Sequence, residues 1–160
     1  MAVDMFLKLD GIKGESQDHK HKDEIHIESF SWGMSQTGAH GTGGGGGAGK
    51  VAVHDISVSK NFDKSSTDLM LYCASGKHIP EGLITVRKAG DKPLEYLKIK
   101  LTDILISSVQ ESGHGSGDLL SESLSLNFAK FQVDYQEQKA DGSGTPAGNM
   151  GWDIKKNEKV

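Results

Sequence analysis

The sequence is short of three things that commonly staple or anchor a protein: cysteine, aromatic residues and long apolar runs. Cys73 is the single cysteine, so the chain forms no internal disulfide and has to be stable under reducing conditions. No window approaches the roughly 20 apolar residues of a membrane-spanning helix, and the amino terminus has no basic segment followed by an apolar stretch. We therefore expect no membrane insertion and, if the protein is exported, a route that uses no signal peptide.

A concentrated block of basic residues is also missing. The chain has 18 Lys and Arg against 22 Asp and Glu, a formal net charge of -4, and the two signs are interspersed. Nucleic-acid binding relies on clustered Lys and Arg, so we do not expect nucleic acid as a partner. Aromatics make up only 6%, and without a basic stripe beside them we expect Phe128 and Phe131 to pack in a core.

What the sequence does contain is alternation of apolar and polar residues, in a chain of 160 residues that is long enough for one core. This pattern predicts a single domain over residues 1–160 and about seven β-strands, at residues 5–9, 25–32, 51–60, 83–88, 94–109, 119–135 and 151–154. The segments 11–24, QESGHGSGD and KADGSGTPAGN are predicted as surface loops or connections. A mainly β fold, either a barrel or a sandwich, follows.

One helix is predicted, in the segment KSSTDLMLYCASGK. Ser65 or Ser66 is expected as its N-cap, and Gly76 as its stop. Leu69, Tyr72 and Cys73 fall on one face, so we expect that face to pack inward and Cys73 to be a structural thiol and not a nucleophile paired with His78.

The strand at 25–32 changes its apolar face partway along. Ile27 shares a face with Ser29 and Ser31, whereas Phe30 and Trp32 lie on the opposite face. Such a switch is typical of a strand that bends or contains a bulge.

Residues 38–50 read GAHGTGGGGGAGK, and within them residues 44–50 have the spacing of a phosphate-binding loop up to the lysine. The motif then requires Ser or Thr and the start of a helix, but Val51 follows Lys50 and begins a strand pattern. We therefore favour an extended glycine-rich loop and keep a nucleotide-binding enzyme as the less favoured alternative.

Other candidate chemistry is weaker still. His19, His21 and His26, with the neighbouring Asp18, Asp23 and Glu24, follow no metal-ligand spacing, and such a segment is typically solvated. The sequence has no evident Ser-His-Asp order, pair of catalytic carboxylates or CxxC pair. We expect no catalytic residue, no cofactor and no metal.

Several segments, in their order and spacing, carry a family resemblance. They are MAVDMFLKLDGIKGES, FSWGMSQTG, GKVAVHDISVSKNFDKSSTDLM, ASGKHIP, TVRKAG with EYLKIKL, LNFAKFQVDYQEQKADG and GWDIKKN. Over nearly its whole length the chain resembles the Hcp family, the haemolysin-coregulated tube proteins of bacterial type VI secretion systems.

The resemblance implies a small β-barrel of two packed antiparallel sheets with one short α-helix on its side. It also implies a homo-hexamer whose rings stack into a tube, effector proteins in the lumen, and a spike protein, a baseplate and a contractile sheath as partners. The protein would assemble in the bacterial cytoplasm and then be secreted. A phage-like tail-tube protein, which shares the architecture, is the alternative.

Two sets of site residues are expected from the resemblance together with the strand pattern. Ser31 is predicted to face the ring lumen and contact effectors. The contact between stacked rings is predicted in the glycine-rich loop, at Gly38, His40, Gly43, Gly44, Gly45, Gly46, Gly47, Gly49 and Lys50.

Overall fold

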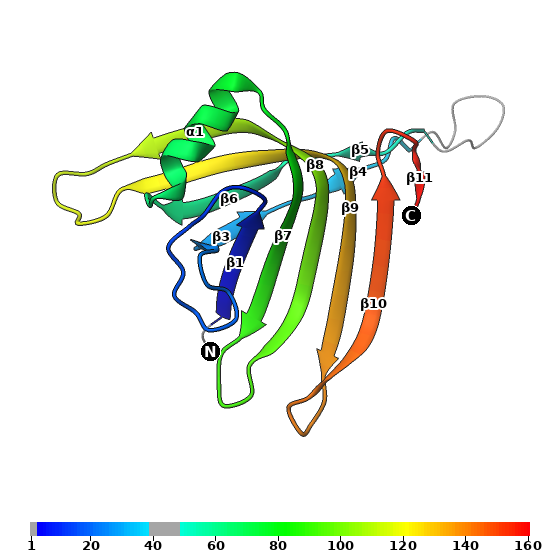
Figure 1. Cartoon of the computed structure of the whole chain (residues 1–160). Coiled ribbons are helices and arrows are strands. Elements are labelled where there is room, and N and C mark those ends of the chain that lie inside the picture. The colour runs from blue at the N-terminus through cyan, green and yellow to red at the C-terminus, as the bar shows by residue number, and fades with distance from the viewer. Residues whose placement is uncertain (1–2, 39–48) are drawn as a thin grey trace.

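The computed structural model describes residues 3–38 and 49–160, and over these residues the chain is antiparallel β-sheet with one α-helix (Figure 1). The mainly β fold class predicted from the sequence is confirmed. The elements, in chain order, are β1 (Val3–Leu9), β2 (Ile25–Ile27), β3 (Ser29–Ser31), β4 (Met34–Ser35), β5 (Ala52–Val53), β6 (Ile56–Asn61), α1 (Ser65–Ser75), β7 (Ile79–Lys88), β8 (Leu94–Ser112), β9 (Ser121–Gln138), β10 (Gly144–Asp153) and β11 (Glu158–Lys159).

The paired strands form two layers joined by the long strands β8 and β9. One layer runs β2-β1-β7-β8-β9-β10-β11, and in the other β3 pairs with β6, which pairs with β9. Only Glu28 separates β2 from β3, so the circuit of paired strands closes through this bend. A positive φ of 56° at Asp103 and a register shift between Ile106 and Ser108 mark the point where β8 passes from one layer to the other.

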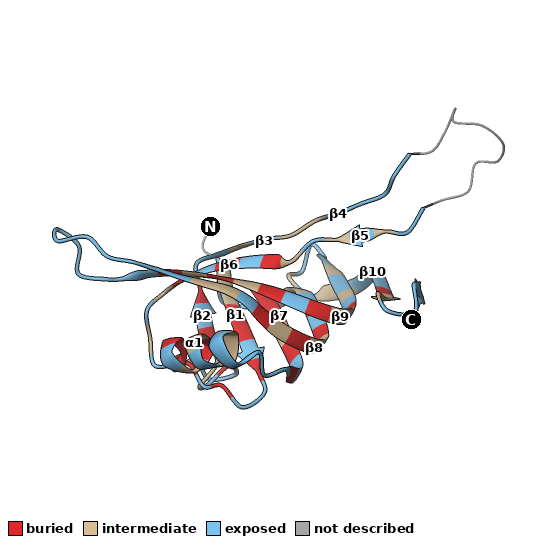
Figure 2. Cartoon of the chain, turned by 90° about the horizontal axis from the view of Figure 1, so that it is seen from above, coloured by how far each residue is buried: buried red, intermediate tan, exposed pale blue. Residues whose placement is uncertain are grey.

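The hydrophobic core lies between these layers, because each strand turns its alternate apolar side chains inward. Leu7, Ile84, Leu101 and Leu126 are fully buried, one from each of four strands. Helix α1 adds Leu69 from the side, while Tyr72 and Cys73 pack against the same core, as the sequence predicted. Figure 2 shows β3 and β6 in one layer and β1, β7 and α1 on the other side.

The helix begins differently from the prediction. Lys64 holds the N-cap position, and the Asp63 carboxylate accepts a hydrogen bond from the Ser65 backbone N–H at 2.9 Å. Ser65 and Ser66 are buried inside the first turn, so their prediction as N-cap is wrong. The predicted stop is confirmed, since Gly76 closes the helix with a left-handed φ of 71°.

Two segments predicted as surface loops or connections are more ordered than expected. Segment 139–143 forms the turn, but strand β10 already starts at Gly144 and pairs with β9. Segment 13–24 covers the outer side of β1, where His21 stacks on Phe6 with ring centroids 4.3 Å apart. Both aromatic rings are buried as a result. The sequence pattern of segment 13–24 did not reveal this packing, because the apolar surface that the segment buries belongs to Phe6 on strand β1.

Candidate functional site, a serine-lined sheet face

The outer face of the layer formed by β3, β6, β9 and the second half of β8 is lined with serine. On each strand, serines alternate with apolar residues that enter the core, as in the burial pattern of β6. We call this surface the serine face. It comprises Ser29, Ser31, Ser57, Ser59, Ser108, Ser112, Ser121, Ser123 and Ser125, with Gln110 among them.

The strand register aligns these side chains in rows across the sheet. In one row Ser31 pairs with Ser57, Ser57 with Ser125, and Ser125 with Ser108. The last two hydroxyls hydrogen bond to each other at 2.9 Å. A second row runs from Ser29 through Ser59 and Ser123 to Gln110. The face therefore offers many small hydroxyl groups and almost no apolar side chain.

Ser31 is exposed at the β3 end of the first row. Its neighbours in sequence turn the other way: Phe30 packs on the core, and Trp32 packs edge-to-face on Phe128 and Phe131, with ring centroids 5.9 and 4.9 Å apart. These buried contacts hold the strand end so that the Ser31 hydroxyl points away from the core. That it faces a lumen stays a prediction.

Sequence reasoning singled out Ser31 but missed the rest of the serine face. The signal was present, because the segments ISVS and SESLSLN repeat the same alternation. The chain does not reveal, however, that β6 lies between β3 and β9, and only that order joins the serines into one surface.

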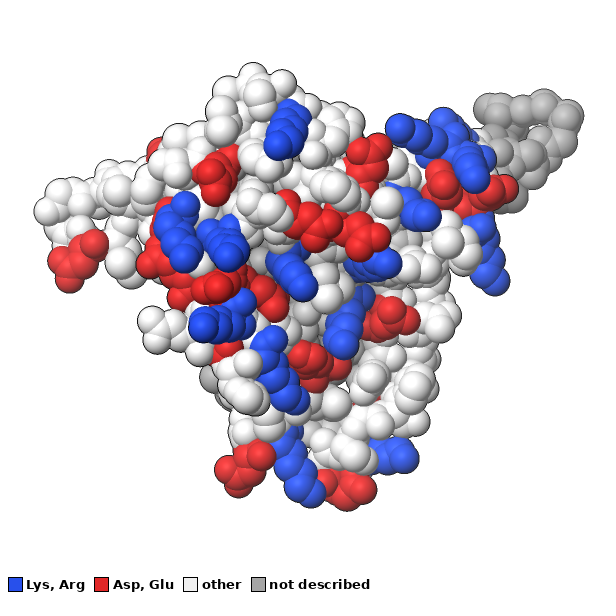
Figure 3. All heavy atoms as spheres, in the orientation of Figure 1, with Lys and Arg blue, Asp and Glu red and all other residues white. Residues whose placement is uncertain are grey.

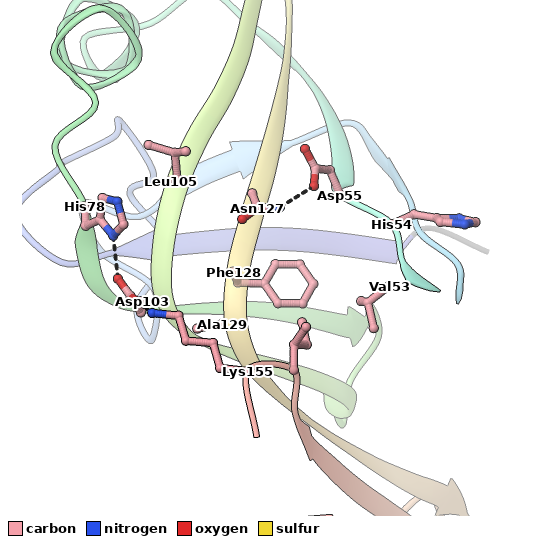
Figure 4. A pocket seen from close by; sticks show the side chains of 11 residues that line it. Val53, His54, Asp55, His78, Asp103, Leu105, Asn127, Phe128, Ala129 and Lys155 are labelled. Carbon is pink, nitrogen blue, oxygen red and sulfur yellow. Dashed lines mark hydrogen bonds and ion pairs between the residues drawn. The ribbon is translucent and has the colours of Figure 1, made fainter. Parts of the chain in front are cut away.

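A groove lies beyond the end of the serine face, between β8, β9 and the carboxyl-terminal turn (Figure 4). Its volume is about 230 Å³, and its apolar lining comes from Val53, Leu105, Phe128 and Ile154. We call it the C-terminal groove. At its rim the Asp103 carboxylate contacts His78 Nδ1 at 2.6 Å and Lys155 Nζ at 3.5 Å. The hydrogen bond from His78 lowers the pKa of Asp103 below its ordinary value.

A buried ion pair underlies the other end of the serine face. Lys60 Nζ contacts the Glu122 carboxylate, Asp63 Oδ1 at 3.0 Å and Ser66 Oγ at 3.1 Å, and the side chains of Lys60 and Glu122 are fully buried. Burial, together with a hydrogen bond and the charge of Glu122, raises the pKa of the nearby Glu111 to about 7. This cluster ties the base of the β8–β9 hairpin to the start of α1.

Gly38, Gly49 and Lys50, predicted in the ring contact, are exposed and lie outside any strand. They flank the short β4–β5 pair. His40, Gly43, Gly44, Gly45, Gly46 and Gly47 lie outside the described residues. The next element after Lys50 is β5, a strand, whereas a phosphate-binding loop requires a helix N-terminus there.

The chain matches a protein-family model described as type VI secretion system effector, Hcp, over residues 6–135. It belongs to the Hcp family. It is 53% identical to Protein hcp1 of Pseudomonas aeruginosa, over 98% of each chain. Among solved structures it is similar to Hcp1 from Salmonella typhimurium, with 37% identity, 100% of both chains covered and a TM-score of 0.79. A structure of a type six secretion system protein, 29% identical, gives a TM-score of 0.92 with 99% of this chain and 100% of that chain covered.

Membership of the Hcp family places the protein among the secreted structural proteins of type VI secretion and not among enzymes. Within residues 3–38 and 49–160, no group of three or more His, Cys, Asp or Glu side chains is placed to hold a metal ion. No helix in those two ranges is long and apolar enough to cross a membrane. His21 instead contacts Glu24 at 2.9 Å and Glu95 at 2.7 Å, which fastens segment 13–24.

Proposed function

We propose that this Hcp protein is a tube subunit: it forms six-membered rings whose lumen is lined by the serine face, carries effectors there, and is secreted with them. The observation that supports this most is the pair of hydroxyl rows across four strands. Small hydroxyls offer hydrogen bonds without a fixed apolar footprint, which suits a passage whose cargo varies. Ser31, exposed at one end of a row, is the proposed effector contact.

The open edges of the serine-face sheet support ring formation. In the described part of the chain, β3 pairs with β6 on one side and has no strand on the other, and β7 leaves β8 unpaired beyond Ile104. Residues 105–112 of β8 therefore have no strand partner on that side, and helix α1 contacts β8. Open edges favour strand pairing with another chain. A head-to-tail contact between copies covers both edges and closes into a ring when the rotation between copies allows it.

For stacking, we propose the glycine-rich loop 38–50 as the contact between rings. The β4–β5 pair flanks this segment, and the freedom of a glycine backbone suits contact with a neighbouring surface. The stacked tube would then meet the spike protein, the baseplate and the contractile sheath after assembly in the bacterial cytoplasm.

Two experiments test the proposal. Negative-stain electron microscopy of the purified protein should show six-membered rings, and a monomer that persists at high concentration would refute them. The Ser31→Glu variant should keep its rings and lose co-purifying effector, because a bulky charge replaces a hydroxyl on the lining. Thr67→Glu, an exposed change on α1, is the matched control and should retain effector. Equal retention in both variants would contradict the assignment of the serine face.

A further inference from the structure

The β8–β9 hairpin ends in exposed apolar side chains. Leu119 is 65% exposed and Leu120 is 50% exposed, next to Asp118 in a turn otherwise made of small and polar residues. The Phe62 backbone N–H donates to the Leu120 carbonyl at 2.8 Å, which fixes the base of the turn. We call residues 113–120 the hairpin tip. Adjacent leucines held in water in this way favour burial against another surface.

The C-terminal groove has the complementary character. Its lining combines apolar side chains with polar ones such as Asp55 and Asn127, and Phe128 points into it toward Val53 (Figure 4). His78 and Lys155 stand at its rim. The β8–β9 hairpin projects away from the side on which the carboxyl terminus lies (Figure 2), and the groove lining comes from the middle of β8 and β9 and from the turn after β10. The tip therefore cannot reach the groove of its own chain.

The charges of the hairpin tip and of Lys155 are opposite. Between residues 110 and 123 there is no Lys or Arg, and Glu122 is buried against Lys60, so Asp118 is the charge at the tip. Beside the groove, residues 154–159 carry Lys155, Lys156 and Lys159 against Glu158, while the groove lining itself holds Asp55 and Asp103. Figure 3 shows basic side chains with acidic ones among them at this end, and an acidic group at the hairpin end. Complementary charge steers such surfaces together and sets their orientation.

We propose that the hairpin tip of one copy docks in the C-terminal groove of the next copy. Leu119 or Leu120 enters the groove against Phe128 and Ile154, and the Asp118 carboxylate lies beside Lys155. The occupant is a second copy of this chain because each copy presents both halves of the contact at separate places on its surface. This contact is heterologous, so repeating it generates a closed ring or a filament. The inference rests on the proposed ring and names the residues that join its subunits.

Disulfide cross-linking tests the contact directly. In a Cys73→Ser background, the Leu119→Cys/Lys155→Cys variant should form intermolecular disulfides under mild oxidation, visible as a ladder on a non-reducing gel. A ladder that ends at six chains places the contact within the ring, and a longer one places it between rings; either result supports it. The control pairs Leu119→Cys with Asp91→Cys, in the β7–β8 turn, and should give no ladder.

The outcome separates this inference from the proposed function. Rings in the microscope without a Leu119–Lys155 ladder would overturn the contact and leave the tube subunit standing. If the protein formed neither rings nor a ladder, both the contact and the tube subunit would be overturned. A charge swap gives a second readout: Asp118→Lys and Lys155→Asp should each weaken association about tenfold in analytical ultracentrifugation, and the double variant should recover it. A double variant that associates no better than the single ones would also overturn the contact.

Discussion

Removing one partner of the buried Lys60–Glu122 ion pair should strongly destabilise the folded protein, whereas replacing both partners with apolar residues should cost little stability. Both side chains are fully buried, so the Lys60→Met variant leaves the Glu122 carboxylate without its cation, and Asp63 adds a second negative charge nearby. Removing one partner of a buried pair costs roughly 3–5 kcal/mol of unfolding free energy. In a domain of this size about 1 kcal/mol corresponds to 2–4 °C, so the midpoint of unfolding should fall by roughly 10 °C.

The assay is urea and thermal unfolding at matched protein concentration, because assembly contributes to apparent stability. The Lys60→Met/Glu122→Leu double variant should recover most of the loss, since an apolar pair needs no solvation of charge. Lys100→Met is the matched control: its partner Glu81 lies 3.8 Å away with both side chains about half exposed, so its loss should stay below about 1 kcal/mol. A Lys60→Met loss as small as that of Lys100→Met would refute the reasoning.

Two further predictions concern neighbouring regions. The pKa of Glu111 is raised to about 7, so the folded state binds its proton more tightly than the unfolded chain does. The stabilising contribution of that proton should be complete below about pH 4.5 and fall as the pH rises through about 7; Glu111→Gln should flatten this dependence in urea unfolding, and an unchanged pH profile would exclude Glu111 as its source. At Gly14 an added Cβ would lie 2.5 Å from the backbone oxygen of Glu24, so Gly14→Ala should push segment 13–24 off β1 and cost about 1–3 kcal/mol. Hydrogen exchange of that segment would show the change, and protection equal to wild type would contradict it.

Local sequence patterns predicted most of the strands, because the alternation of side chains along a strand is set by its own backbone and does not depend on neighbouring strands. The bend in the strand at 25–32 was visible in the same way and is observed at Glu28. The helix stop at Gly76 also depends only on local chemistry, the ease with which glycine adopts a positive φ.

The burial of residues that depend on partners far along the chain could not be predicted from local sequence patterns. Lys60 sits in the alternation of β6 as an inward residue, yet its burial depends on Glu122, which lies on another strand. His21 was grouped with a solvated loop, although Phe6 and Glu95 bury it. In both cases a polar side chain is stabilised by a partner far along the chain, and no periodicity reports on such a partner.

The sequence by itself determined that this is an Hcp protein, that it is mainly β, and that Ser31 lies opposite Phe30 on its strand. Only the tertiary structure decided that Ser31, Ser57, Ser125 and Ser108 form one row. The physical reason is that alternation fixes the side to which a residue points, whereas strand order and register are set by long-range hydrogen bonding and core packing. The serine face, the hairpin tip and the C-terminal groove therefore form only when strand order and register are established.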